Sequence, residues 1–385
     1  MRVLIAHQGC IPIYRKSFFS LLNRHHPNCY VVIHGPVPPG SDLLLASPPY
    51  DFPNLQVRSV FIRVLGKLFI WQSIVWKAFK GDFDAAVLGD EVKYLSNLVV
   101  AVILKLRGRP VLLWGFGYHQ YDQAQIGFAA RLSALVAERF KGLFYRLATG
   151  YLTYTEHGAK RLRSNKDAPR SVSVLWNTVD IKHQTELKSA VKDESLETIC
   201  SDLGVRLDSV KLVYFGRLIT TKRVDLLVQY ARKRNSMTPN VDIIIFGTGA
   251  EESELQRSSQ DLPNVVFHRH DDMKLSRALR VSAAVVIPGF LGLAVTHAFA
   301  HGIPMLTRAS DWHSPEIDYL KDGTNGLILP AAPDLFFQAL DDFVGNPELQ
   351  QRLAKGAIET SALIDMDHMV RTFDSLVVKC LEGAI

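Results

Sequence analysis

The sequence predicts an α/β protein made of two doubly wound domains, on three observations. Short apolar runs alternate with amphipathic segments along all 385 residues, which is typical of parallel sheets covered by helices. The stretch from Asp180 to Thr198 turns polar and charged, which indicates a domain boundary. The formal charge of +6 is uneven: residues 1–180 carry 22 Lys and Arg against 11 Asp and Glu, and residues 181–385 carry 22 against 27, so +11 and −5 sum to +6.

We therefore expect an N-terminal domain over 1–180 and a C-terminal domain over 181–365, each of ordinary domain size. A last helix over 366–385 is expected to return to the N-terminal domain. The basic first half suggests an anionic partner, namely a lipid surface, a phosphorylated acceptor or nucleic acid. The alternative is that these lysines and arginines are ordinary solvent-exposed side chains without a partner.

Composition excludes several classes of protein. With 48% hydrophobic and 21% charged residues the chain is not disordered. No apolar run reaches the ~18 to 20 residues of a membrane span, and the first residues are typical of a strand rather than of a signal peptide. Four scattered cysteines show no paired spacing, so we expect neither a metal centre nor a disulfide framework, and a reducing compartment fits.

The first predicted strand, Arg2 to Ala6, leads into a turn and a helix. Ligands of doubly wound sheets bind at the carboxyl ends of strands, so an acceptor would meet Gly9, Tyr14 and Arg15 there. A plain turn before a helix is the alternative. Further strands are predicted over residues 29–33, 57–61, 85–88, 110–114, 151–154 and 172–175.

Two strand ends in this half carry polar residues. Asp90 and Glu91 follow the strand 85–88, where they either orient an acceptor hydroxyl or cap the helix that begins near Tyr94. His119 lies in a loop after the strand 110–114, which makes it a candidate catalytic group. The alternative for His119 is a solvent-exposed loop histidine.

Two segments of the same half have helical spacing with cationic flanks. Residues 64–83 place Leu68, Trp71, Val75 and Phe79 on one helical row, with lysines off that row. Residues 127–148 show a longer apolar face beside arginines and a lysine. Each predicts either a helix packed on the sheet or one that lies on an anionic membrane.

The C-terminal half repeats the alternation, with strands predicted over 210–215, 241–246, 265–268, 285–287 and 305–307. Glycine turns follow three of these strands, at Gly216, at Gly247 with Gly249, and over 288–292. Arg217 and Lys222 lie in the first of these turns. Two cations beside backbone N–H groups predict a site for a nucleoside diphosphate and for stabilising its departure.

From Leu212 to Gly326 the order GRLxxxK, IIFGTG, NVVFH, PGFLGL, AFAHGIP and HSPEIDYLKDGTNG resembles the C-terminal domain of glycosyltransferase family 4. These are retaining enzymes of GT-B fold, with two Rossmann-like domains facing a central cleft. WNTVD extends the resemblance, because it is similar to the family's Asn-Gly-Val-Asp segment at the end of the first domain.

The resemblance implies transfer of a sugar from a UDP- or GDP-linked donor, without a metal, to an acceptor held by the N-terminal domain. Arg217 and Lys222 would bind the diphosphate and stabilise its departure, with His119 as the catalytic candidate of the other domain. The remaining donor-site residues would be Gly216, Gly247, Gly249, His268, Gly289, Phe290, Leu291, Gly292, Leu293 and His297.

Two positions depart from the family pattern. Most members carry two glutamates eight positions apart, one on the donor sugar and one on the ribose, and here these positions hold Gly289 and His297. His297 can still hydrogen-bond a ribose hydroxyl, whereas Gly289 has no side chain for a sugar hydroxyl. We therefore expect a deoxy or amino sugar, or a sugar held elsewhere. The family histidine near Trp114 is not matched in register either.

We interpret the sequence as a retaining hexosyl- or deoxyhexosyltransferase that acts on a saccharide or lipid-linked acceptor in polysaccharide biosynthesis. It is expected in the cytoplasm, with peripheral contact to the inner face of a membrane left open, and without a nucleic-acid partner. A sugar-nucleotide epimerase or phosphorylase of the same shape, a non-catalytic sugar-nucleotide-binding protein and the inert partner of an active transferase are the alternatives. A dinucleotide-dependent oxidoreductase is disfavoured because no G-x-G-x-x-G follows the first strand.

Overall fold

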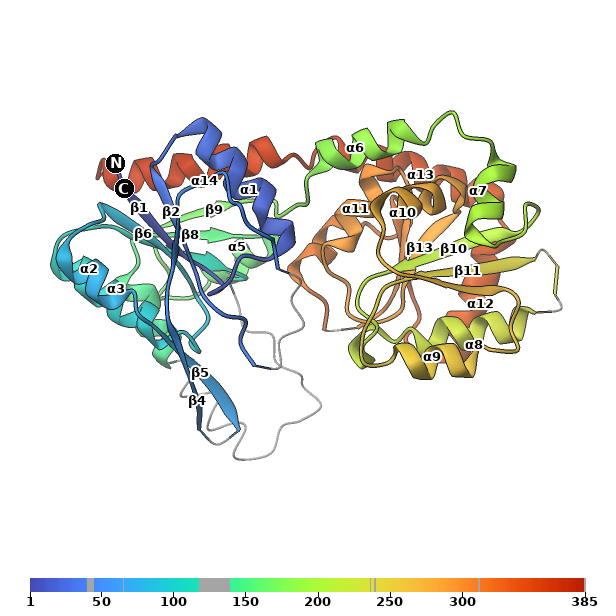
Figure 1. Cartoon of the computed structure of the whole chain (residues 1–385), viewed down its shortest axis with the longest axis horizontal. Coiled ribbons are helices and arrows are strands. Elements are labelled where there is room, and N and C mark those ends of the chain that lie inside the picture. Colours follow the sequence, from blue (N-terminus) through green and yellow to red (C-terminus); the bar gives the residue numbers. More distant parts are fainter. Residues whose placement is uncertain are drawn as a thin grey trace. The chain divides into compact units, whose positions relative to one another are not determined.

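The computed structural model describes residues 1–39, 45–64, 66–117, 139–235, 237–238, 240–310 and 312–383. The chain divides into two compact units (Figure 1). Unit 1 comprises Met1–Val179 together with Met366–Ile385, and unit 2 comprises Asp180–Asp365. Unit 2 is therefore an insertion in the chain of unit 1.

Unit 1 contains a parallel sheet in the order β3-β2-β1-β6-β7-β8-β9. Its strands are β1 (Val3–Ala6), β2 (Tyr30–His34), β3 (Asn54–Gln56), β6 (Ala85–Gly89), β7 (Val111–Gly115), β8 (Gly150–Thr153) and β9 (Ser171–Val174). The helices of this unit are α1 (Ile13–His25), α2 (Val75–Lys80), α3 (Leu95–Leu106), α5 (Glu156–Arg163) and α14 (Met366–Leu381). Strand order reverses between β1 and β6, which makes the carboxyl ends of these strands a topological switch point.

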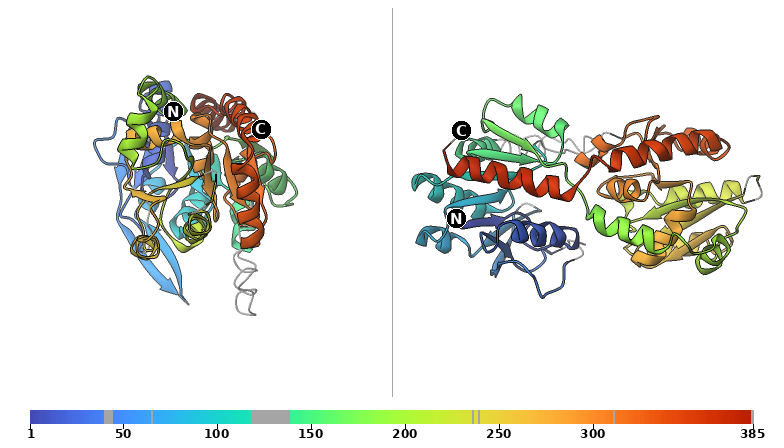
Figure 2. Two further views of the ribbon diagram at one scale, coloured as in Figure 1. Left: turned by 90° about the vertical axis from the view of Figure 1, so that its right-hand side faces the viewer. Right: turned by 90° about the horizontal axis from the view of Figure 1, so that it is seen from above.

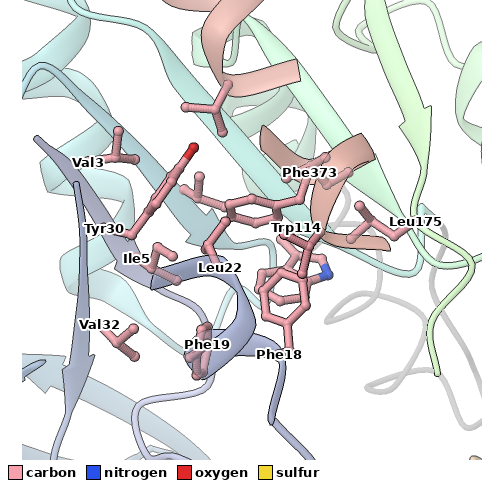
Figure 3. Packing of buried hydrophobic residues seen from close by; sticks show 14 of the residues in the cluster. Val3, Ile5, Phe18, Phe19, Leu22, Tyr30, Val32, Trp114, Leu175 and Phe373 are labelled. Carbon is pink, nitrogen blue, oxygen red and sulfur yellow. The ribbon is translucent and has the colours of Figure 1, made fainter. Parts of the chain in front are cut away.

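Both faces of this sheet are covered, as the fully apolar strands require. Val3 and Ile5 of β1 pack into one core with α1 and α14, and Leu4 and Ala6 pack into a second core with α2 and α3. The first core is rich in aromatic side chains. Trp114 lies there against Phe18 and Phe373, at ring centroid distances of 5.4 and 5.3 Å (Figure 3).

The helix predicted over residues 64–83 is wrong. Residues Ser59–Val64 and Lys67–Gln72 form an antiparallel hairpin, β4 and β5, and only Val75–Lys80 is helical, as α2. The hairpin reaches away from the body of unit 1 (Figures 1 and 2). The β-branched and aromatic residues of this segment favour strand, and cross-strand pairing outweighed the helical spacing.

Unit 2 contains a parallel sheet in the order β12-β11-β10-β13-β14-β15. Its strands are β10 (Val210–Phe215), β11 (Val241–Phe246), β12 (Val265–His268), β13 (Ala284–Ile287), β14 (Met305–Arg308) and β15 (Gly326–Leu329). The bounds predicted for β10, β11 and β12 are confirmed. The order reverses between β10 and β13, so the switch point lies where the turns after these two strands meet.

Helices cover both faces of this sheet as well (Figure 1). They are α6 (Ile181–Ala190), α7 (Leu196–Leu203), α8 (Asp225–Arg234), α9 (Glu252–Ser258), α10 (Asp272–Val281), α11 (Ala294–Ala300), α12 (Pro333–Val344) and α13 (Pro347–Ser361), with the 3₁₀ turns η2 (Thr220–Lys222) and η3 (Pro315–Tyr319). The α/β fold class predicted from the sequence, two doubly wound Rossmann-like domains, is confirmed for each unit.

Candidate functional site

The turns after β10 and β13 are joined at the switch point of unit 2. The Phe290 N–H donates to the Thr221 carbonyl at 2.8 Å, and the Lys222 ammonium donates to the Phe290 carbonyl at 2.6 Å. We call these two contacts, between residues 221–222 and 289–290, the clasp. It brings the two turns that the sequence predicted for the diphosphate into direct contact.

Gly289 is buried inside the clasp. A Cβ at this position would lie 2.1 Å from the Thr221 oxygen and 2.7 Å from the Lys222 oxygen, far closer than van der Waals contact. The backbone of the first turn therefore occupies the direction in which a side chain at position 289 would begin. The η2 turn can approach this closely because position 289 carries no side chain.

Lys222 is held in a partly desolvated position. Burial, and after it the nearby Arg217 guanidinium, lowers the pKa of Lys222 to about 8, and Glu316 opposes this shift. The ammonium has three N–H donors, and one of them points to the Phe290 carbonyl. The Arg217 side chain is exposed at the same turn, and the Tyr214 hydroxyl fixes its backbone by donating to the Arg217 carbonyl at 2.7 Å. The turn thus presents two cationic groups.

The loop after β13 is fixed by a histidine that the sequence did not single out. The Leu291 N–H donates to His313 Nδ1 at 3.1 Å, and His313 Nε2 donates to the Arg308 carbonyl at 3.0 Å. Burial lowers the pKa of His313, which agrees with a neutral ring that accepts at Nδ1. Leu291 was predicted for the donor site, but its N–H already donates to His313. The amides of Gly292 and Leu293 donate no backbone hydrogen bond within the described residues.

The glycine turn after β11 lies against the turn after β10. A Cβ on Gly247 would be 1.9 Å from the Gly216 oxygen, and one on Gly249 would be 2.2 Å from the Leu218 oxygen. The Leu218 N–H donates to the Thr248 carbonyl at 2.9 Å. The three glycine turns therefore form one continuous backbone surface at the carboxyl edge of the sheet.

His297 lies on α11 beside the end of β10. Its ring centroid is 4.9 Å from that of Phe215 and 5.6 Å from that of His301. Burial, followed by the charges of His301, His270 and His183, lowers the pKa of His297 to about 3, so the ring is neutral at physiological pH. Among the described residues it has no recorded hydrogen-bond partner, so both nitrogens remain available to a ligand hydroxyl.

His268, which was predicted for the donor site, hydrogen-bonds other residues of unit 2 through its ring and its backbone. Its Nε2 donates to the Leu203 carbonyl at 3.1 Å, which ties the ring to the end of α7. Its backbone carbonyl accepts from the Gly247 N–H at 3.0 Å and supports the glycine turn. Burial lowers the pKa of His268.

Two of the residues predicted for the acceptor are anchored in the carboxyl edge of unit 1. Gly9 has a positive φ of 71°, and its carbonyl accepts from the Gly35 N–H at 2.7 Å. Tyr14 and the Gln8 side chain hydrogen-bond at 3.0 Å. His119, the catalytic candidate, lies outside the described residues, as does the larger part of the segment 127–148.

Arg15 and His7 lie in a buried aromatic cluster that the sequence did not reveal. Arg15 is 2% exposed, and its Nη1 donates to the Asn177 side-chain oxygen at 2.7 Å. Its Cζ lies 4.7 Å from the centroid of the Trp114 ring, and the His7 ring stacks on the same tryptophan at 4.1 Å. His7 Nε2 hydrogen-bonds the Tyr154 hydroxyl at 2.9 Å. A cavity of about 10 Å³, the room of one water molecule, is lined in part by His7, Gln8, Cys10 and Pro12.

Asp90 neither caps a helix nor faces an open site. Its carboxylate pairs with the Lys141 ammonium at 2.9 Å and accepts from the Tyr151 hydroxyl at 2.6 Å, and all three side chains are buried. Burial opposes the ammonium form, but the Asp90 charge outweighs it and raises the pKa of Lys141 above its ordinary value. The capping prediction is wrong for Glu91 as well, because α3 begins at Leu95 without a side-chain cap and Glu91 pairs with Lys93 at the surface.

Two further properties concern the described residues as a set. They contain no group of three His, Cys, Asp or Glu side chains placed to hold a metal ion. They also contain no helix with the length and hydropathy that a membrane crossing requires.

Comparisons with known proteins match the part of the chain that contains these turns. Residues 197–360, which include all three glycine turns, match the model of glycosyl transferases group 1. A D-inositol 3-phosphate glycosyltransferase of a Nocardioides species is 25% identical over 241 residues, which are 56% of this chain and 50% of that protein. The chain thus matches about half the length of that curated relative.

Solved structures resemble the fold over nearly the whole chain. Anabaena HepE in complex with UDP has a TM-score of 0.68 at 14% identity, with 98% of this chain and 100% of that chain covered. Sucrose-phosphate synthase of Thermosynechococcus elongatus has a TM-score of 0.68 at 15% identity, with 99% of each chain covered. At such identities the likeness shows the fold, which is that of the GT-B glycosyltransferases. Fold and family model together support a glycosyltransferase, and residues 197–360 are the part of the chain that resembles group 1.

Proposed function

We propose that the protein is a retaining glycosyltransferase that moves a sugar from a UDP- or GDP-linked donor to a saccharide or lipid-linked acceptor in glycan biosynthesis. One arrangement carries this proposal: Arg217 and Lys222 share a switch point with the amides of Gly292 and Leu293. Cations and backbone N–H groups of this kind hold a diphosphate and stabilise its negative charge. UDP in the HepE structure supports the nucleotide part.

The reaction needs no protein nucleophile. The acceptor hydroxyl attacks the anomeric carbon from the face that the diphosphate leaves, the carbon–oxygen bond to the diphosphate breaks, and the hydroxyl proton passes to the departing phosphate oxygen. Arg217 and Lys222 neutralise the charge that develops on that oxygen, which is the role of a metal ion in other transferases. We therefore propose transfer without a resident metal.

The clasp affects which donor sugar the site can accept. The turn 220–222 fills the direction in which a carboxylate at position 289 would begin, so a sugar hydroxyl finds no acidic partner from Gly289. We infer a hexosyl donor with fewer hydroxyls at this contact, such as a deoxy or N-acetylated sugar. Turnover of a panel of nucleotide sugars tests this, and a clear preference for glucose or galactose donors would contradict it.

A non-catalytic sugar-nucleotide-binding protein, or the inert partner of an active transferase, is the second candidate. The observation that favours it is the replacement of both expected carboxylates by Gly289 and His297. The two candidates differ in one measurement. A transferase releases free UDP or GDP from the donor in the presence of acceptor, whereas a binding protein raises its melting temperature with donor and releases none.

The experiment that tests donor binding is a thermal-shift screen with UDP, GDP and ADP and their sugars, since ligands of the native state raise the melting temperature by mass action. Arg217→Ala and Lys222→Ala should remove the shift, and Lys355→Ala, at an exposed position of α13, should keep it. An unchanged shift in Arg217→Ala and Lys222→Ala would overturn the assignment.

We also propose that unit 1 contacts the inner face of a membrane. Trp76 and Phe79 of α2 are 63% and 53% exposed and stack on each other at 5.6 Å. Lys80 and Arg107 lie over these rings, at 5.6 and 5.4 Å from the centroids, and the neighbouring Leu106 is 83% exposed. Exposed aromatic rings with cations beside them suit an anionic lipid surface.

A further inference from the structure

The Arg15 guanidinium is a buried charge with no counter-charge in the part of the chain that the structure describes. Among the described residues no carboxylate lies within ion-pair distance of it, and its Nε has no hydrogen-bond partner. The rings of Trp114, Tyr14 and Tyr154 lie 4.7, 5.3 and 5.4 Å from Cζ and offset part of the cost through cation–π contact. An uncompensated buried cation is otherwise strongly destabilising, so this position is suited to an anionic ligand.

A second buried group in the same cluster also lacks a partner. His7 is 7% exposed, and its Nδ1 has no hydrogen-bond partner among the described residues. Burial, and then the charge of Arg15, lowers the pKa of His7 well below its usual value, so the ring is neutral. The tautomer in which Tyr154 donates to Nε2 carries its proton on Nδ1, which can then donate to an oxyanion.

The backbone contributes donors at the same place. Arg15 is in the first turn of α1, a helix of 13 residues whose N-cap, Pro12, offers no side-chain cap and whose first turn has no acidic residue. The first N–H groups of an uncapped helix attract anions. Pro12 and His7 line the same small cavity, so the helix terminus and the end of β1 adjoin.

We propose that the carboxyl edge of unit 1 holds an oxyanion, a phosphate or carboxylate, that the acceptor carries, bound between Arg15 and the N-terminus of α1. The inference that this anion belongs to the acceptor rests on the proposed glycosyl transfer. The cavity of about 10 Å³ that His7 and Pro12 line is too small for a phosphate, so the proposed anion would lie outside that cavity, at the first turn of α1. Its place at the switch point between β1 and β6 is where doubly wound sheets bind ligands.

The test must exclude the cations of unit 2, which also attract phosphate. The full-length Arg217→Ala/Lys222→Ala variant is therefore titrated with inorganic phosphate at constant ionic strength, with chloride as the balancing anion. Saturating phosphate should raise its melting temperature by roughly 2 to 4 °C. Adding Arg15→Gln should weaken phosphate binding about tenfold or more. Adding Arg24→Gln, at the other end of α1, should leave it unchanged.

Hydrogen exchange of the Arg217→Ala/Lys222→Ala protein gives an answer even if Arg15→Gln does not fold. Phosphate should slow exchange in a peptide that covers residues 7–22 and should leave peptides of α12 unchanged. An equal melting shift with and without Arg15→Gln, or unchanged exchange in residues 7–22, would overturn the proposal. Because Arg217 and Lys222 are removed in this background, and because Arg15 and residues 7–22 belong to unit 1, these results are separate from donor binding at those two cations.

Competition with bound phosphate identifies the kind of molecule that carries the anion. Glucose 6-phosphate should displace phosphate where glucose does not, if the acceptor is a soluble phosphosugar. Vesicles with phosphatidic acid, compared with phosphatidylcholine alone, should displace it if the anion is a lipid headgroup. Displacement by either supports the proposal, and failure of both phosphorylated probes would reduce the site to an adventitious ion only and contradict it.

Discussion

Gly289 and Thr221 are in such close contact that a single methyl group cannot be placed between them. A Cβ on Gly289 would lie 2.1 Å from the Thr221 oxygen, which itself accepts the Phe290 N–H. We expect Gly289→Ala to lower the free energy of unfolding by about 1 to 3 kcal/mol, as forced overpacking does, and to weaken binding of nucleoside diphosphates.

Gly292→Ala is the matched control for the stability effect, because its Cβ would meet Ser314 Oγ at an ordinary 3.7 Å. Thermal and urea unfolding of the two variants gives the comparison. Equal stability of Gly289→Ala and the natural protein would mean that the η2 turn moves freely, and the clasp would then not be a fixed feature.

Lys222 should make donor binding depend on pH. The protonated ammonium binds the diphosphate, and its pKa of about 8 means that the charge is lost as pH rises through that value. The dissociation constant of UDP, measured by calorimetry, should therefore rise from pH 8 to 9.5, by up to about tenfold per pH unit. Lys222→Arg, which stays charged, should flatten the profile.

The same shift affects folding with the opposite sign. The folded chain releases the Lys222 proton at lower pH than the unfolded chain, so the contribution of this group to stability increases as pH rises above 8. Affinity and stability should thus diverge above pH 8. A parallel fall of both would indicate general alkaline unfolding instead.

His297 is predicted to bind the donor as a neutral ring. His297→Ala should raise the dissociation constant of UDP by about 5- to 15-fold, the loss of one hydrogen bond. Because its pKa is lowered to about 3, affinity should show no step near pH 6.5 that depends on His297. His157→Ala, at an exposed histidine of α5, is the control. Unchanged affinity in His297→Ala would remove the residue from the site.

The buried Asp90–Lys141 pair should be important for stability. Removing one partner leaves an unpaired buried charge, so Lys141→Met should cost about 3 to 5 kcal/mol, and Asp90→Asn/Lys141→Met should cost less than the sum of the single changes. The surface pair Arg109–Asp84 is the contrast, since Arg109→Ala should cost about 1 kcal/mol or less. Denaturant unfolding measures all four variants.

The exposed aromatic pair of α2 should determine membrane binding. Trp76→Ser/Phe79→Ser should reduce co-sedimentation with phosphatidylglycerol-containing vesicles several-fold, because it removes the exposed aromatic pair of α2. Leu335→Ser, at a 54% exposed position of α12 in unit 2, should have no effect. Absence of binding by the natural protein at low salt would contradict membrane contact.

The sheets were predictable because their strands are buried on both faces. Val241 to Phe246 is apolar apart from Asp242. Such a short apolar run between turn residues is typical of a buried strand. The hairpin β4–β5 was not predictable from periodicity, because a mostly exposed two-stranded ribbon alternates weakly. Its Leu68 and Trp71 also fit one helical row with Val75 of α2. Local spacing does not reveal pairing across a turn.

The candidate site was predictable where it depends on backbone and not where it depends on distant side chains. Gly216, Gly247 and Gly289 are recognisable because glycine turns after strands have a sequence pattern. His313 and Lys141 are not, because their partners, Leu291 and Asp90, are 22 and 51 positions away in the chain (313 − 291 and 141 − 90). The cluster of His7, Arg15 and Asn177 likewise joins residues from both ends of the first 180 positions.

The insertion of unit 2 into unit 1 sets an order of events during synthesis. All residues of unit 2 have left the ribosome once Asp365 has, but unit 1 lacks Phe373, which packs against Trp114, until the last helix follows. The first 179 residues therefore have an incomplete aromatic core while the residues of the unit 2 sheet are synthesised. Unit 1 is synthesised first, but its core is completed only after all of unit 2 has been synthesised.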